Sequence, residues 1–192
     1  MRIRMAITGT SMLLMSSQRA ADPTDPLVKE YKSIYGKRKK TDEDLTQLAD
    51  LEFMLRIYHS EEMGPYIPAI NLKRCIQDGA KRSKQGKVVD EGLQTVKERF
   101  KLLYTGPRGL EELQADRNFR DTRLVGVESR LTLRTRPCFS EWGLVAEFNV
   151  VPELLSLADV VGYAKQAGAL KGLGDYRPEF GKFEVTNIQT LD

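Results

Sequence analysis

Residues 167–185 read AGALKGLGDYRPEFGKFEV and join a helical pattern to a strand pattern. Glycines stand at positions 168, 172 and 174, and Arg177-Pro178 and Gly181 follow them. Glycine adopts positive φ angles without a Cβ clash and lets another backbone or a phosphate approach closely. The stretch therefore predicts a helix–loop–strand unit that closes the chain, with a candidate anion site in the loop.

The spacing of apolar residues predicts the helix and strands next to this loop. Ser156 is a predicted N-cap for a helix over residues 157–168, whose apolar positions share one face. Residues 180–188 form the last predicted strand. Upstream, residues 128–136 and 142–151 both alternate in the way that strands do. We expect these two segments to pair as a hairpin.

The first half of the chain supplies another strand and several helices. In residues 1–7, Ile3, Met5 and Ile7 alternate with Arg2, Arg4 and Ala6, as in a half-buried strand. The patterns also predict a helix over 27–35 that ends at Gly36, a helix that starts after the N-cap Thr41, and one that starts near Pro68. Residues 96–104 fit a helix or a strand equally well.

The order strand, helix, strand, strand, helix, strand predicts an α+β fold of the ferredoxin-like βαββαβ type. We expect one domain over residues 1–192, with helical and loop insertions at about 16–65 and 85–122. An antiparallel sheet with two helices on one face leaves its other face free. That free face, or a cleft made by the insertions, is the natural binding surface.

Composition narrows the class of protein. Hydrophobic residues make up 41% of the 192 residues and charged residues 30%, which is typical of a globular protein. The formal net charge of +3 is mildly basic, so the placement of the charge matters more than its sum. The two cysteines, Cys75 and Cys138, form no C-x-x-C pair, and a reducing cytoplasm is their simplest location. His59 is the sole histidine, which excludes a multi-histidine metal site; we predict no metal and no cofactor.

The start of the chain has a weak likeness to a signal peptide, with Arg2, Arg4 and a later Ala20-Ala21. Residues 8–11, Thr-Gly-Thr-Ser, interrupt its apolar run and argue against that interpretation. No apolar run reaches the ~18 residues of a membrane helix. The expectation is a cytoplasmic protein without a membrane partner.

The glycine loop, Gly172 to Pro178 followed by Phe180 to Phe183, resembles the glycine-rich ending of the repeat-associated RAMP superfamily. Those proteins form backbone and processing subunits of CRISPR effector complexes. Residues 67–69, Ile-Pro-Ala, and 79–81, Gly-Ala-Lys, resemble the helix that follows their first strand. The resemblance implies a ferredoxin-like fold and binding of RNA or single-stranded DNA. A single histidine departs from the processing nucleases, so cleavage does not carry over.

A second resemblance spans most of the chain. Residues 17–23, 66–69 and 135–137, together with the glycine loop, are similar to small uncharacterised proteins of tailed bacteriophages and prophages. This likeness implies a phage origin, and hence the cytoplasm of a host cell.

Three groups of residues are candidate nucleic-acid contacts. The first is a period-two arginine stripe, which can meet successive phosphates or bases; its alternative is a solvated face paired with acids. The second is the glycine loop with its cations, whose amides can form an anion nest; its alternative is a tight turn in which glycines serve packing. The third is the basic second half of the helix after Pro68. The members are Arg130, Arg134 and Arg136; Lys171, Gly172, Gly174, Arg177 and Lys182; and Lys73, Arg74, Lys81 and Arg82.

The predicted function is non-catalytic binding of RNA or single-stranded DNA. We expect copies of the protein to assemble along the strand or in a larger complex. The alternative is a phage assembly or protein-interaction factor, such as a structural subunit or an inhibitor of a host defence complex. The modest net charge of +3 favours this alternative. An enzyme is not expected, because no carboxylate pair is placed by the sequence and His59 lies in a predicted turn.

Overall fold

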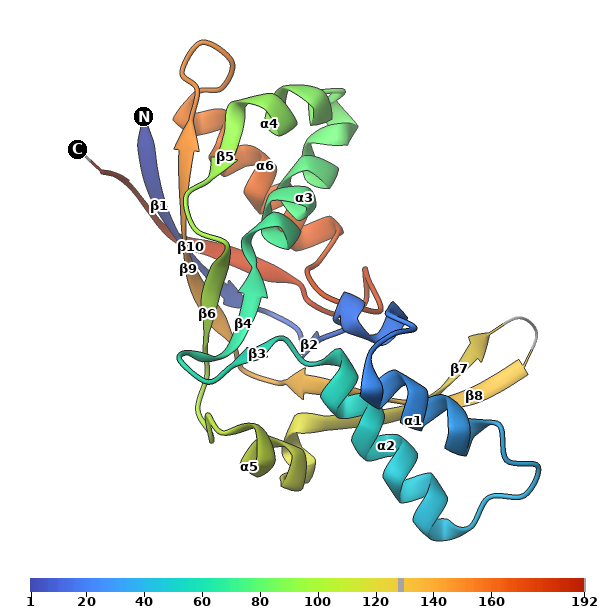
Figure 1. Cartoon of the computed structure of the whole chain (residues 1–192). Coiled ribbons are helices and arrows are strands. Elements are labelled where there is room, and N and C mark those ends of the chain that lie inside the picture. Colours follow the sequence, from blue (N-terminus) through green and yellow to red (C-terminus); the bar gives the residue numbers. More distant parts are fainter. Residues whose placement is uncertain (128–129, 192) are drawn as a thin grey trace.

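A computed structural model describes residues 1–127 and 130–191 of the chain; the side chains of residues 127, 130 and 131 are outside the description. The protein has an α+β fold with antiparallel sheets (Figure 1). The strands of the main sheet lie in the order β10-β1-β9-β6-β4-β3, and β5 also pairs with β9. Their bounds are β1 Arg2–Gly9, β3 His59–Ser60, β4 Gly64–Pro68, β5 Leu93–Thr95, β6 Arg99–Leu103, β9 Gly143–Val150 and β10 Phe183–Leu191.

Alternation of apolar and polar residues sets which face of the sheet is buried. In β1, Ile3, Met5 and Ile7 are buried and Arg2 and Arg4 are exposed, as the sequence predicts. In β9 the residues Leu144, Ala146, Phe148 and Val150 all lie in the same core. Because the side-chain period of a strand is two, the residues between these positions form the opposite face.

Three helices cover the buried face (Figure 1). They are α3 Ala69–Ala80, α4 Gly86–Gly92 and α6 Leu157–Leu170. The hydroxyl of the N-cap Ser156 accepts a hydrogen bond from the amide of Asp159, and the carboxylate of Asp159 accepts one from the amide of Ser156. This capping box satisfies helix-end donors and confirms the predicted start of α6.

Helices α3 and α6 cross with their backbones in close contact at Gly79. A Cβ atom at this position would lie 2.6 Å from the carbonyl oxygen of Tyr163 and 2.8 Å from the amide nitrogen of Ala167. Glycine in a helix interior costs about 1 kcal/mol relative to alanine. The close crossing is the packing reason for its presence.

A second layer contains a smaller sheet and a helical hairpin. Its sheet has the order β2-β8-β7, and helices α1 and α2 pack beside β8 (Figure 1). The bounds are β2 Leu13–Leu14, α1 Pro26–Tyr35, α2 Asp42–Arg56, α5 Leu110–Ala115, β7 Arg120–Val127 and β8 Arg130–Phe139, with short 3₁₀ turns η1 Gln18–Ala21, η2 Lys81–Ser83 and η3 Arg117–Phe119. Gly36 caps α1 and Thr41 caps α2 through a capping box with Asp44, as the sequence predicts.

The predicted pairing of residues 128–136 with 142–151 is wrong. Strand β8 pairs with β7, whereas β9 lies between β1 and β6. The physical reason is that the side chains of the two strands differ. One face of β9 is apolar throughout and packs in the core, whereas the arginines of β8 form ion pairs with carboxylates of α2 and the glycine loop.

The strand that pairs with β9 in place of β8 comes from the ambiguous segment 96–104. There β6 buries Phe100 and Leu102 and exposes Arg99, Lys101 and Leu103. It lies inside the range 85–122 that the sequence assigns to an insertion, so part of that range belongs to the main sheet.

Candidate nucleic-acid interface

The glycine loop folds back on itself and on the neighbouring strand. Gly172, Gly174 and Gly181 have φ angles of +75°, +85° and +74°, a region that favours glycine. A Cβ on any of them would clash with a backbone carbonyl oxygen, of Phe180, Leu14 and Leu173 in turn. The glycines therefore serve close backbone packing here.

The amides of this loop are used inside the protein. Leu173 N donates to Gly181 O at 2.8 Å, Asp175 N to Leu14 O at 2.8 Å, and Gly181 N to Met12 O at 2.8 Å. An anion nest needs amides that point at a free site. These three are occupied, so the packing alternative accounts for this part of the loop.

A shallow groove of about 640 Å³ lies beside the loop, where α3 and α6 end. It collects Lys81, Lys171, Gly174 and Arg177 from the predicted site. Its cations stand among acids: Lys81 Nζ lies 2.6 Å from Asp78 Oδ1, and Arg177 Nη1 lies 3.9 Å from Asp78 Oδ2. The groove is mixed in charge rather than basic.

The remaining cations of α3 and the loop are not gathered in this groove. Lys73 pairs with Asp90 at 3.3 Å and also donates to the backbone oxygen of Asp90 at 2.7 Å. Arg74 and Arg82 are exposed, and Lys182 is half-buried and lies outside the lining of the groove.

The arginine stripe on β8 faces into the protein. Arg134 Nη1 donates to Glu52 Oε1 at 2.6 Å, and Arg136 Nε donates to Asp175 Oδ2 at 2.5 Å. Only 9% of the Arg136 side chain and 19% of the Arg134 side chain is exposed. The side chain of Arg130 lies outside the described residues. The two described arginines of the stripe link β8 to α2 and to the glycine loop.

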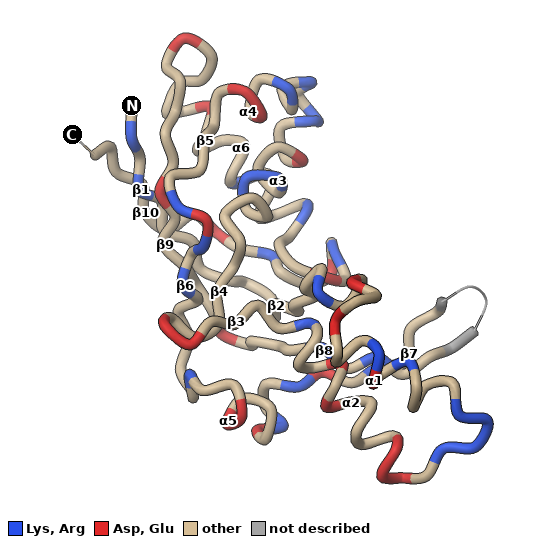
Figure 2. The backbone as a smooth tube through the Cα atoms, viewed as in Figure 1, with Lys and Arg blue, Asp and Glu red and all other residues tan. Residues whose placement is uncertain are grey.

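The open face of the main sheet carries a second set of basic side chains, which sequence reasoning placed on no site. They are Arg2, Arg4, Lys97, Arg99 and Lys101. Arg2 and Arg4 lie on the exposed side of β1, and Arg99 and Lys101 on that of β6. No helix in the described part of the chain covers this side (Figures 1 and 2). The signal was present in the alternation of residues 1–7 and in the strand interpretation of 96–104.

One carboxylate lies among three of these cations. Glu147 on β9 accepts from Arg2 Nη2 at 2.7 Å and from Arg4 Nε and Nη2 at 3.1 and 2.9 Å. Lys97 Nζ lies 3.7 Å from it. The hydrogen bonds from Arg2 and Arg4, with the charge of Lys97 beside them, lower the pKa of Glu147 to about 2. With these five cations and one acid the patch has a formal charge of +4.

The basic groups of the chain do not share one surface. Figure 2 places the Lys37–Lys40 loop between α1 and α2 at one end of the molecule and the cations of η2 at the other. The open-face set lies on a third side, along β1 and β6 (Figure 2).

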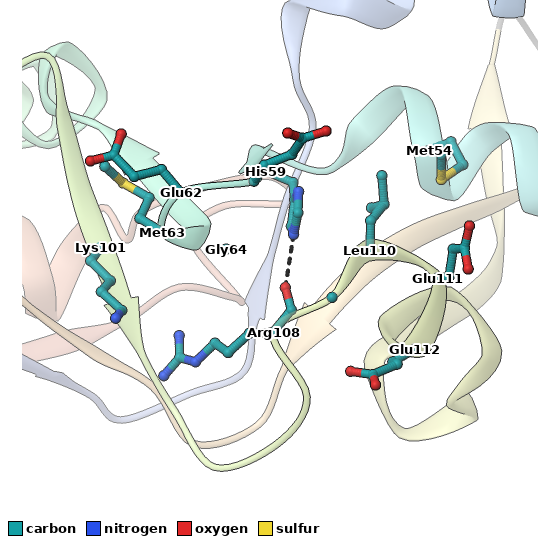
Figure 3. A pocket seen from close by; sticks show the side chains of 12 residues that line it. Met54, His59, Glu62, Met63, Gly64, Lys101, Arg108, Leu110, Glu111 and Glu112 are labelled. Atoms are coloured by element: carbon teal, nitrogen blue, oxygen red, sulfur yellow. Dashed lines mark hydrogen bonds between the residues drawn. The ribbon is translucent and has the colours of Figure 1, made fainter.

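A pocket of about 690 Å³ adjoins the open face at Lys101 and is acidic (Figure 3). Glu61, Glu62, Glu111 and Glu112 line it together with His59, whose Nε2 lies 2.8 Å from the carbonyl oxygen of Arg108. That hydrogen bond makes Nε2 the protonated nitrogen. Within residues 1–127 and 130–191, no group of three or more His, Cys, Asp and Glu side chains is arranged to hold a metal ion.

Comparison with protein-family models and with curated protein sequences found no match. Among the described residues, no helix combines the length and the apolar character needed to cross a membrane.

Proposed function

We propose that this protein binds single-stranded RNA or DNA without catalysis, and that the strand crosses the open face of the main sheet. One observation carries the proposal: Arg2, Arg4 and Lys97 lie within 4.0 Å of Glu147, and Arg99 and Lys101 stand on the exposed side of β6, on a sheet face that no described helix covers. Phosphate contacts by Lys and Arg supply most of the affinity for nucleic acid.

Exposure of the side chains supports this choice of surface over the β8 stripe. The exposed fractions of the Arg2, Arg4 and Lys97 side chains are 46%, 48% and 59%, against 9% for Arg136. A guanidinium that is half in water needs little rearrangement to reach a phosphate. If a buried guanidinium moved to a phosphate, the carboxylate paired with it would stay behind as an uncompensated buried charge, which is costly.

A stacking group lies at the edge of the same face. Tyr66 on β4 is directly opposite Lys101 on β6, and the Arg99 guanidinium lies 4.9 Å from the centre of the Tyr66 ring. Aromatic rings and arginine planes next to a basic track are typical of sites for single strands. A strand along β6 would meet both groups.

The ferredoxin-like topology and the phage origin are part of the same proposal. We propose that β1, α3, β6, β9, α6 and β10 form a ferredoxin-like βαββαβ core, and the order β10-β1-β9-β6 with antiparallel neighbours supports this. Such a core with an open basic face suits a RAMP-like phage protein that works in the host cytoplasm. Several copies would bind along one nucleic-acid strand.

The test is binding of a labelled single strand of about 20 nucleotides, followed by fluorescence anisotropy between about 50 and 200 mM salt. The proposal predicts affinity that falls steeply with salt and competition by unlabelled single strands of either sugar type. Absent binding, or binding that is indifferent to salt, rejects it.

A second candidate function is protein interaction or assembly, which an apolar groove of about 390 Å³ favours. The groove lies between the α1–α2 hairpin and the β7–β8 sheet, and Tyr35, Leu45 and Leu133 line it with exposed fractions of 45%, 51% and 57%. Exposed apolar surface of this kind marks binding sites for other proteins. Co-purification of a stoichiometric protein partner that survives nuclease treatment would support this candidate.

A further inference from the structure

A small pocket of about 170 Å³ lies where the η1 turn, helices α1 and α2 and strand β8 meet. Its walls combine apolar and charged side chains: Ala20, Val28, Tyr31, Lys32, Glu52, Leu55, Arg56 and Arg134. Three of these are cations and one is an acid, so the lining has a formal charge of +2.

The charges around this pocket do not balance. Arg56, Arg134 and Arg136 lie close together with two carboxylates, Glu52 and Asp175, near them. Arg134 Nη1 forms an ion pair with Glu52 Oε1 at 2.6 Å, and Arg136 Nε forms one with Asp175 Oδ2 at 2.5 Å. Arg56 is left over: within the described part of the chain no carboxylate lies within 4.0 Å of its guanidinium.

The hydrogen bonds of these arginines are incomplete in the same place. Arg56 Nη1 donates to Ser16 Oγ at 2.7 Å, but its buried Nε has no partner among the described residues. The buried Nη1 of Arg136, which lies near Arg56 but outside the pocket lining, has none either. Burial lowers the pKa of Arg56; the charge of Glu52 partly offsets this, and the charges of Arg136 and Arg134 act in the same direction as burial. Unsatisfied buried donors on a crowded set of cations are a cost that a bound anion removes.

We propose that this pocket is a binding site for a phosphate group, held by Arg56 with Lys32 at its rim. Arg134 keeps its Nη1 hydrogen bonds to Glu52 and Tyr31 and adds positive charge beside the phosphate. The volume sets the size of the ligand, because pockets for whole small molecules start at about 300 Å³. A phosphate fits; a base or sugar must stay outside. Guanidinium groups suit phosphate because their donors match its oxygens in pairs. The proposal does not rest on nucleic-acid binding at the open face, since the two surfaces share no residue.

The phosphate can come from two sources, free inorganic phosphate or the terminal phosphate of a nucleotide strand. Isothermal titration at constant ionic strength with three probes separates them: inorganic phosphate, a dinucleotide with a 5′-phosphate, and the same dinucleotide with a 5′-hydroxyl. Saturable binding of either phosphate probe supports the site, and the tighter of the two identifies the source. No binding of either probe beyond a chloride reference overturns the proposal.

Variants tie the binding to the pocket. Arg56→Met should weaken phosphate affinity by about tenfold or more, as expected for loss of a charge-assisted hydrogen bond. Lys32→Met is on the exposed side of α1, so it tests the site even if Arg56→Met does not fold; it should weaken affinity by a few-fold. Lys29→Met, at an exposed cation of α1 outside the pocket lining, is the matched control and should leave phosphate affinity unchanged. The assignment is contradicted if Lys32→Met and a folded Arg56→Met both keep wild-type affinity, if Lys32→Met keeps it where Arg56→Met does not fold, or if Lys29→Met loses as much affinity as Lys32→Met.

Discussion

Arg4 on β1 and Glu147 on β9 face one another across an antiparallel pair, with two guanidinium nitrogens 2.9 and 3.1 Å from one carboxylate oxygen. The carboxylate is shared with Arg2 and lies near Lys97, so it neutralises part of a basic surface. Removing its charge should therefore act on stability and on binding in opposite directions.

Glu147→Gln is expected to tighten binding of a single strand by a few-fold, because the patch gains one positive charge and Arg2 and Arg4 are freed for phosphates. The measurement is anisotropy at about 50 mM salt. Glu153→Gln, on the exposed loop between β9 and α6, removes the same charge outside the patch and is the control. Equal affinities for the two variants would argue against the open face.

The same residue predicts a pH dependence of stability. Its pKa is about 2 in the folded protein against an ordinary value of 4.5, so the ionised carboxylate stabilises the fold above about pH 4.5. This contribution is lost as the pH falls from there through about 2. Urea unfolding should show the largest difference between wild type and Glu147→Gln near neutral pH, and a shrinking difference in acid. A constant difference down to about pH 2.5 would contradict the assigned ion pairs.

The contact between α3 and α6 gives a prediction about packing. Gly79→Ala places a Cβ against the Tyr163 carbonyl, and the strain should outweigh the gain in helix propensity, for a net loss of about 1–3 kcal/mol of unfolding free energy. Gly162→Ala, on α6, meets nothing within 4 Å and should stabilise by about 0.5–1 kcal/mol. Chemical denaturation of both variants checks the pair, and a stabilising Gly79→Ala would refute the close crossing.

The ion pair of Glu52 and Arg134 should behave as a structural unit. Glu52→Gln leaves a mostly buried guanidinium without its charge partner, for an expected loss of about 3 kcal/mol. Adding Arg134→Met should restore part of that loss, because the orphaned charge is then absent. A double-mutant cycle of unfolding free energies measures the coupling, and additive losses would show that the pair contributes nothing.

Local sequence was enough to predict much of the secondary structure. The caps at Thr41 and Ser156, the end of α1 at Gly36 and the buried face of β1 all depend on residues a few positions apart. Trp142, the first residue of the alternating segment 142–151, is buried in the core.

The candidate site was harder to predict because the pairing of charges is not local. Whether an arginine on β8 meets water or a carboxylate depends on Glu52, 82 residues away from Arg134, and on Asp175, 39 residues away from Arg136. Alternation alone cannot distinguish these cases. The same limit applies to Arg4 and Arg99, which only the sheet order brings onto one face.

The location of the nucleic-acid site is tested most directly by comparing two triple variants that lose equal charge. Lys97→Gln/Arg99→Gln/Lys101→Gln removes three positive charges from the open face, and Lys81→Gln/Lys171→Gln/Arg177→Gln removes three from the groove beside the glycine loop. Binding of a labelled single strand is measured over a salt series for both. The open-face variant should lose most of the affinity and reduce the slope of log affinity against log salt by about 2, while the groove variant stays near wild type. The reverse result would contradict the proposed site.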